Sequence, residues 1–138
     1  MAGMSLDSTL VGRTFPATQP YRVSEEKVAE FAAASGTPYE PGGQVPATFP
    51  IVLAFAAMND FLDTVGVDLS RIVHGEQKFA YERPLVAGDV LTTALTVASL
   101  RQIGGNDILG TRSDVTDADG TLVCSTSAVL VHRGEAGA

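Results

Sequence analysis

The chain has 138 residues, of which 45% are hydrophobic and 18% are charged, and its formal net charge at pH 7 is −7. This length and balance predict one globular domain spanning residues 1–138, with an ordered core over about residues 11–133. The negative charge argues against binding to nucleic acid, which requires clustered Lys and Arg, and against binding to an anionic membrane surface. The longest apolar stretch is too short to cross a bilayer.

One cysteine, Cys124, cannot form an internal disulfide, which fits a reducing compartment. Residues 1–10 have neither the basic nor the apolar region of a signal peptide, so we expect a cytoplasmic location. Cys124 lies in an alternating run typical of a strand and has no recognisable activating base, which favours a structural role. The sequence has no Cys/His cluster with metal-ligand spacing and no glycine-rich phosphate motif, so we expect neither a metal nor a cofactor.

The first elements in the chain are a strand near Thr14–Val23 and a helix over Ser24–Ser35. Ser24 is a suitable N-cap because its hydroxyl can accept a hydrogen bond from a free amide of the first turn. Gly36 is suited to a left-handed helix stop. The loop that follows, to Pro46, contains three prolines and two glycines, which exclude regular structure.

A second helix is predicted over Pro50–Val65, with Gly66 as its stop. Proline is well suited to the first turn of a helix, where its missing N–H costs nothing. Residues 51–58 are all apolar, so the pattern predicts a helix that is buried on every side. In a domain of this size, such a helix must be wrapped by the remaining elements.

The second half of the chain reads as strands with alternating side chains, separated by hairpin turns such as Gly104–Asp107. The predicted strands are Ile72–Glu82, Val90–Gln102, Ile108–Thr116 and Thr121–His132, which we expect to form an antiparallel meander. A long helix clasped by a curved antiparallel sheet is an α+β domain of the hot-dog type. Because an isolated domain of this kind leaves a sheet edge and a helix face uncovered, we expect it to dimerise.

Two adjoining motifs carry a family resemblance. The segment Tyr81–Leu85, followed by Ala87–Asp89, resembles the MaoC-like (R)-specific enoyl-thioester hydratases and dehydratases. The preceding segment, His74–Phe79, resembles the actinobacterial dehydratase subunits of type II fatty-acid and mycolic-acid synthesis, including their non-catalytic subunits. It also resembles the N-terminal half of double hot-dog hydratases. Gly12–Pro16 and Gly105–Leu109 extend the resemblance over most of the chain.

The resemblance implies an acyl-thioester substrate, carried on coenzyme A or on an acyl-carrier protein. It also implies a catalytic Asp and His after the first helix, in a pattern like Gly-Asp-x-Asn-Pro-x-His. In this chain Thr37 stands where the Asp is expected, and no His occurs before His74. A threonine hydroxyl cannot replace a carboxylate in acid–base chemistry, so the sequence predicts that this pair is missing.

The resemblance and the start of the second helix point to substrate-binding residues. The segment Thr48–Pro50 begins the second helix, and the free amides of its first turn predict a site for a thioester oxygen, because helix N-termini favour negative charge. The predicted substrate-binding residues are Thr37, Tyr39, Thr48, Phe49 and Gln77.

Three titratable side chains are alternative catalytic candidates. His74, beside Glu76, could act as an acid or base, although a structural histidine is the simpler interpretation. Glu40 is the single carboxylate in the loop that replaces the family motif, and Asp60 interrupts the apolar helix. The other histidine, His132, is expected to be solvated at the chain end.

Three functions follow from these candidates. The leading hypothesis is a dehydratase or hydratase subunit without the Asp–His pair, which binds the acyl chain and pairs with a catalytic hot-dog subunit. The second is a self-sufficient hydratase or thioesterase that uses His74, Glu40 or Asp60. The third is an acyl-thioester binding module without turnover. The chain would accordingly form a heterodimer or a homodimer.

Overall fold

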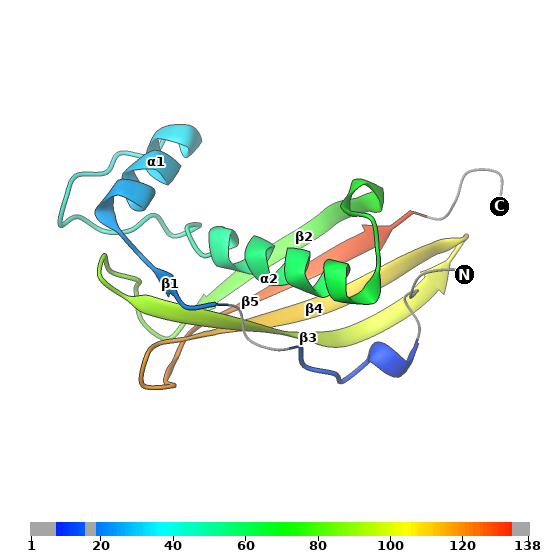
Figure 1. Ribbon diagram of the computed structural model, residues 1–138. Coiled ribbons are helices and arrows are strands. Elements are labelled where there is room, and N and C mark those ends of the chain that lie inside the picture. The colour runs from blue at the N-terminus through cyan, green and yellow to red at the C-terminus, as the bar shows by residue number, and fades with distance from the viewer. Residues whose placement is uncertain (1–7, 16–18, 134–138) are drawn as a thin grey trace.

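A computed structural model describes residues 8–15 and 19–133 and contains two α-helices and one five-stranded antiparallel sheet (Figure 1). The helices are α1 (Glu25–Ser35) and α2 (Ile51–Val65), with short 3-10 turns η1 (Ser8–Leu10) and η2 (Leu69–Arg71). The strands are β1 (Tyr21–Arg22), β2 (Ile72–Tyr81), β3 (Val90–Ile103), β4 (Asn106–Thr116) and β5 (Leu122–His132). The curled sheet runs along α2, so the predicted hot-dog architecture is confirmed.

The strand order in the sheet is β1-β3-β4-β5-β2. Strands β3, β4 and β5 form the predicted meander, but β2 pairs with β5 rather than with β3. The prediction of four strands in chain order is therefore wrong, because the connection from β2 to β3 carries the chain past two strands. As a result, β2 lies at one edge of the sheet.

The strand predicted near Thr14–Val23 is mostly irregular. It contains the two-residue β1, which pairs with the start of β3, and an isolated bridge between Thr14 and Thr96. Residues 16–18 of the predicted strand lie outside the described residues.

Helix α1 begins and ends as its sequence predicts. The Ser24 hydroxyl accepts a hydrogen bond from the amide of Lys27 at 3.1 Å, which caps the first turn. Gly36 has a φ of 72° and donates its amide to the carbonyl of Ala33, while the Thr37 amide donates to the carbonyl of Ala32. The helix therefore stops where the backbone can turn left-handed at little cost.

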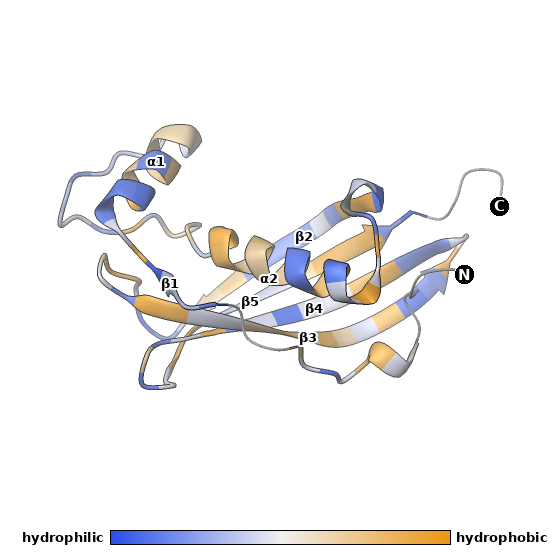
Figure 2. Cartoon of the chain, viewed as in Figure 1, coloured by the Kyte–Doolittle hydropathy of each residue, from blue (hydrophilic) through white to orange (hydrophobic). Residues whose placement is uncertain are grey.

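Helix α2 packs on the inner face of the sheet through one face only. The large side chains Phe61, Leu62 and Leu53 are buried, whereas Phe55 on the opposite face is 44% exposed. Figure 2 shows that hydrophilic residues interrupt the second half of this apolar helix. Asn59 and Asp60 in that half are exposed. The prediction that α2 is buried on every side is therefore wrong for a single copy of the chain, because none of the described residues covers that face.

Candidate functional site

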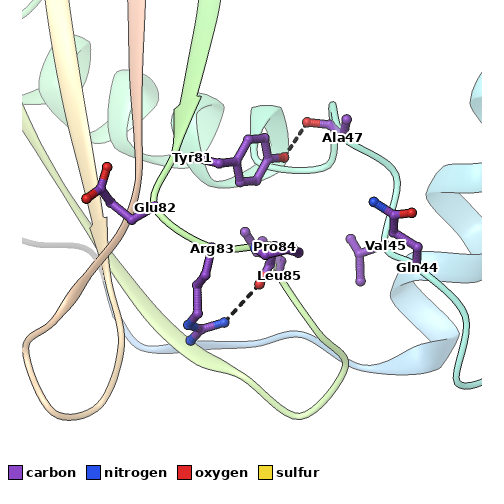
Figure 3. A pocket seen from close by; sticks show the side chains of 8 residues that line it. All are labelled: Gln44, Val45, Ala47, Tyr81, Glu82, Arg83, Pro84 and Leu85. Atoms are coloured by element: carbon purple, nitrogen blue, oxygen red, sulfur yellow. Dashed lines mark hydrogen bonds between the residues drawn. The ribbon is translucent and has the colours of Figure 1, made fainter.

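A cavity of about 370 Å³ lies between the end of β2 and the loop that leads into α2 (Figure 3). The loop supplies Gln44, Val45 and Ala47, and the chain from Tyr81 to Leu85 supplies the opposite wall. The Tyr81 hydroxyl donates a hydrogen bond to the carbonyl of Ala47 and so joins the two walls. The cavity therefore depends on the end of β2 and the loop before α2 keeping their relative positions.

Tyr81 is a titratable side chain in the cavity wall whose environment changes its pKa. Burial, with a smaller contribution from the neighbouring Cys124, raises the pKa of Tyr81 to about 12. Its hydroxyl consequently stays protonated and remains a hydrogen-bond donor at neutral pH. The carboxylate of Glu82 points away from Tyr81 and Val45 (Figure 3).

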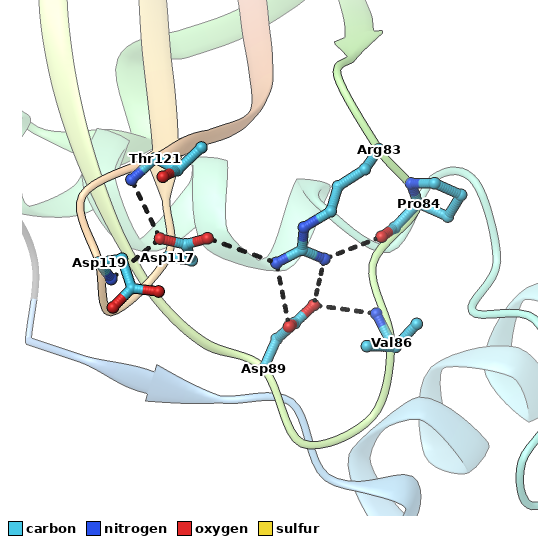
Figure 4. A network of polar contacts seen from close by, with 7 residues as sticks. All are labelled: Arg83, Pro84, Val86, Asp89, Asp117, Asp119 and Thr121. Carbon is cyan, nitrogen blue, oxygen red and sulfur yellow. Dashed lines mark hydrogen bonds and ion pairs between the residues drawn. The ribbon is translucent and has the colours of Figure 1, made fainter.

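The far side of the cavity wall is fixed by an ionic cluster (Figure 4). Arg83 donates two hydrogen bonds to the Asp89 carboxylate, at 3.0 and 3.1 Å, and lies 3.8 Å from the carboxylate of Asp117. It also donates to the carbonyl of Pro84 at 3.0 Å. Because Asp117 belongs to the turn between β4 and β5, the cluster ties the β2–β3 connection to that turn.

The charge of Asp89 is stabilised within this cluster. Burial acts to raise the pKa of Asp89, but hydrogen bonds from the Arg83 guanidinium and the Val86 amide outweigh burial and hold it below its usual range. The ion pair is therefore formed throughout the neutral pH range.

The residues predicted from the loop are spread out rather than gathered in the cavity. Thr37 is exposed and its hydroxyl shares a hydrogen bond with Ser35 at 3.2 Å. Tyr39 packs against the core around Phe49, and Glu40 is exposed, with its carbonyl accepting the Gly43 amide. These positions place no acid–base pair beside the cavity among the described residues.

The start of α2 offers fewer free amides than the sequence predicts. Phe49 is fully buried and its amide donates to the carbonyl of Pro46 at 2.9 Å. The amides of Ile51 and Val52 donate to the carbonyls of Thr48 and Phe49, each at 3.0 Å. Thr48 is exposed beside Ala47, at the entrance to α2.

The structure brings His74 and Gln77 together on β2. A register shift at Gly75 places both on the inner face of the sheet, where both line a small cavity beneath α2. The His74 Nε2 lies 3.2 Å from Gln77 Oε1, and its ring lies 5.3 Å from that of Phe55. Asp60 is exposed on α2, and its carbonyl accepts the hydroxyl of Thr64.

His132 is only partly exposed and is paired with a carboxylate, which corrects the prediction that it is solvated at the chain end. Its Nδ1 lies 3.0 Å from Asp107 Oδ2, and its side chain is only 21% exposed. The β4–β5 register places the two residues directly opposite each other. Sequence separation hides this pairing, because it depends on where two distant strands align.

The sequence does not predict the cavity beside Tyr81, although Tyr81–Leu85 carries the family resemblance. The resemblance therefore marks these residues but does not show that they form the wall of a cavity. Among the described residues, no group of three or more His, Cys, Asp or Glu side chains is arranged to hold a metal ion. Within the same residues, no helix is long and apolar enough to cross a membrane.

Comparison with known proteins identifies the family. The sequence-family model described as the FAS1-like dehydratase domain region matches residues 9–126. The chain belongs to this family. It is 39% identical to a UPF0336 protein of Streptomyces avermitilis and 41% identical to one of Streptomyces coelicolor, each match covering 94% of this chain and 97% of the relative.

Solved structures agree with this membership. A subunit of the C-terminally truncated HadBC complex of Mycobacterium tuberculosis, a (3R)-hydroxyacyl-ACP dehydratase, is 28% identical with a TM-score of 0.80. That match covers 91% of this chain and 99% of the subunit. A MaoC-like dehydratase is 27% identical with a TM-score of 0.74, and the match covers 91% of this chain and 42% of that protein.

Proposed function

We propose that the chain is a subunit of an acyl-thioester dehydratase or hydratase that has no catalytic Asp–His pair of its own. In this proposal it binds and shapes the acyl chain, while a second hot-dog subunit supplies the acid–base pair. The substrate is a 3-hydroxyacyl or enoyl thioester, carried on coenzyme A or on an acyl-carrier protein.

The observation that carries the proposal is the chemistry of the loop between α1 and α2. Residues 36–50 contain one carboxylate, Glu40, and no His. Glu40 is exposed, and the hydroxyl of Thr37 shares a hydrogen bond with the hydroxyl of Ser35. Moving a proton at C2 and activating water or hydroxyl at C3 require titratable groups within hydrogen-bond reach, and this loop offers none beside the cavity.

The free edge of β2 supports the need for a second subunit. Within the described part of the chain, β2 pairs with β5 on one side only. Beside this edge, Phe55 of α2 is 44% exposed and Val73 of β2 is 47% exposed. A ten-residue edge strand flanked by exposed apolar side chains is a ready site for another sheet edge. The similar HadBC structure is itself a complex.

The test is reconstitution with a hot-dog subunit that carries an intact Asp–His pair, encoded in the same genome. We expect the two chains to co-purify and hydrate crotonyl-CoA, and we expect activity to disappear when the partner's His is replaced by Ala. A His74→Ala, Glu40→Ala or Asp60→Ala change in this chain should leave a complex that still hydrates crotonyl-CoA. Activity that survives loss of the partner's pair would refute the proposal.

A self-sufficient hydratase is the second candidate, and the observation that favours it is the position of His74. This imidazole lies at the β2 edge, bonded to Gln77 and next to the cavity beneath α2. Loss of hydration activity in a His74→Ala variant of the isolated chain, with the exposed Lys78→Ala as a nearby control, would support this candidate. Saturable acyl-CoA binding without any turnover, alone or with a partner, would instead indicate a binding module.

A further inference from the structure

The turn between β3 and β4 and the end of β5 lie together at the end of the sheet far from α1 (Figure 1). Here the strand register places Ile108 of β4 between Arg101 of β3 and Val131 of β5. The residue next to each of these three along its own strand is a leucine that packs in or against the core beneath α2: Leu100, Leu109 and Leu130. Since successive side chains of a strand point to opposite faces, the row lies on the outer face of the sheet, away from α2.

Apolar side chains on this outer face reach the solvent. Ile103 lies two residues beyond Arg101 on the same face and is 55% exposed. Ile108 and Val131 are partly buried. Contiguous apolar surface bordered by polar groups marks interaction sites in soluble proteins, so this strip is a candidate for one.

Three arginines border the apolar strip. Arg101 and Arg133 are exposed. The guanidinium of Arg71 is held at the same end by two hydrogen bonds, of 3.1 and 3.0 Å, that it donates to the Arg133 carbonyl. No ion pair among the described residues involves Arg101 or Arg133. The arginine patch consists of these three arginines and the apolar strip: Ile103, Ile108 and Val131.

The carboxylate that adjoins the patch along β4 is bonded on the other face. Asp107 is next to Ile108 and so points to the inner face of the sheet. There its two oxygens lie 2.9 Å from the side-chain amide of Gln102 and 3.0 Å from the ring of His132. The arginine patch is therefore a positive region of a chain whose formal net charge is −7. Such a region attracts an acidic partner that the rest of the surface repels.

We propose that the arginine patch docks an acidic carrier protein that bears the acyl thioester. This inference rests on the proposed function, in which the substrate is carried on coenzyme A or on an acyl-carrier protein, and it selects the second. An acidic amphipathic helix matches the patch, because its carboxylates can accept hydrogen bonds from Arg101 and Arg133 while an apolar side chain covers Ile103. The phosphates of coenzyme A match the arginines but leave the apolar strip uncovered.

The position of the patch suits delivery to the proposed second subunit. Strand β2 begins at this end of the sheet, where Ile72 pairs with His132, and it ends at the cavity beside Tyr81. Every pair of neighbouring strands in the sheet is antiparallel. With the same pairing across the free edge of β2, the end of the partner's edge strand, and with it the partner's acid–base pair, lies beside the start of β2. A carrier held at the patch is then on the side of the partner's site.

The test is a calorimetric titration of the full chain with the unacylated acyl-carrier protein encoded in the same genome. We expect saturable binding that weakens as salt is added, because exposed charges are screened. An Arg101→Glu/Arg133→Glu double variant should bind the carrier about tenfold or more weakly, since it places like charges opposite each other. The matched control is Arg22→Glu, which reverses an exposed arginine beside Val90 at the other end of β3 and should leave the affinity unchanged.

No binding of the carrier by the wild-type chain, or equal binding by the double variant, overturns the proposal. Binding of phosphatidylglycerol vesicles in place of the carrier also overturns it and assigns the patch to a lipid surface. If the double variant does not fold, Arg101→Gln/Arg133→Gln removes the same two charges and decides the question.

The failure of this inference can be told apart from that of the proposed function. Hydration of crotonyl-CoA by the reconstituted complex needs no carrier protein. Hydration without carrier binding therefore refutes the docking surface alone, whereas a complex that hydrates no crotonyl-CoA refutes the proposed function.

Discussion

At the scale of single residues, two positions set what the site can do. Thr37 occupies the place where the family resemblance expects a carboxylate, and its hydroxyl shares a hydrogen bond with that of Ser35. Tyr81 is the polar side chain that joins the two walls of the cavity, through Ala47. The proposed lack of an acid–base pair depends on Thr37, and the shape of the cavity depends on Tyr81.

A Thr37→Asp change should give no measurable hydratase activity in the isolated chain. Groups that act as a unit are strongly non-additive, so half of an acid–base pair supplies almost none of the typical ~10² to 10⁴-fold acceleration. Hydration of crotonyl-CoA by the variant and the wild type is the measurement. A clear rise in turnover would mean that another residue, with His74 as the first to test, already serves as the second group.

A Tyr81→Phe change should lower the free energy of unfolding by about 1 kcal/mol, the typical net value of one hydrogen bond. The pH dependence should change as well. Since the pKa of Tyr81 is raised to about 12, its contribution is present below pH 10 and is lost as pH rises through 12. Denaturant unfolding at neutral and alkaline pH checks both effects, and a variant as stable as the wild type at pH 7 would argue against the bond to Ala47.

An Asp89→Asn change should destabilise the chain by about 2 kcal/mol, because it breaks charged hydrogen bonds to Arg83. The matched control is Glu76→Gln, whose ion pair with Lys78 is exposed and should contribute less than about 1 kcal/mol. With its pKa held low, Asp89 contributes stability above its ordinary pKa, and this contribution disappears as pH falls through the lowered value. Equal losses from both variants would show that the cluster has no special role.

At the scale of elements, local patterns predicted the helices well. Capping by Ser24, the left-handed stops at Gly36 and Gly66 and the alternation along β3 depend only on nearby residues. The position of β2 beside β5 could not be predicted this way, since strand neighbours depend on how a connection crosses the sheet. The His132–Asp107 contact was missed for the same reason, because it requires the β4–β5 register.

The candidate site was predictable in part. The motif Tyr81–Leu85 was visible, but its role as a cavity wall depends on contact with a loop more than thirty residues earlier in the chain. His74 and Gln77 share a face only because the strand shifts register at Gly75, an irregularity that simple alternation does not reveal.

The exposed face of α2 gives a prediction about assembly. A Phe55→Asp change should weaken association with the second subunit by about 2 kcal/mol or more, since buried aromatic anchors dominate interfaces. Folding should be preserved, because Phe55 is 44% exposed in the single chain. Ile103→Asp is the matched control: Ile103 is also exposed, but it lies at the end of β3, away from β2. Titration by calorimetry measures both, and equal weakening by the two changes would place the interface elsewhere.

At the scale of the whole molecule, the chain is a hot-dog layer whose edge strand β2 is paired on one side only within the described residues. The inner face of its sheet holds α2, and the edge strand β2 carries His74 and Gln77 beside the exposed Phe55. Membership of the FAS1-like dehydratase family accounts for the fold, and the loop before α2, residues 36–50, contains one carboxylate and no His. In the proposed function, this chain binds the substrate and its partner supplies the groups that transfer the proton.

The most direct test of this account is the turnover of crotonyl-CoA by the purified chain alone, at a protein concentration high enough to populate any homodimer. We predict no hydration above the uncatalysed rate, with activity appearing only when the hot-dog subunit bearing the Asp–His pair is added. Sustained turnover by the isolated chain, abolished by a change at one of its own side chains, would contradict the account.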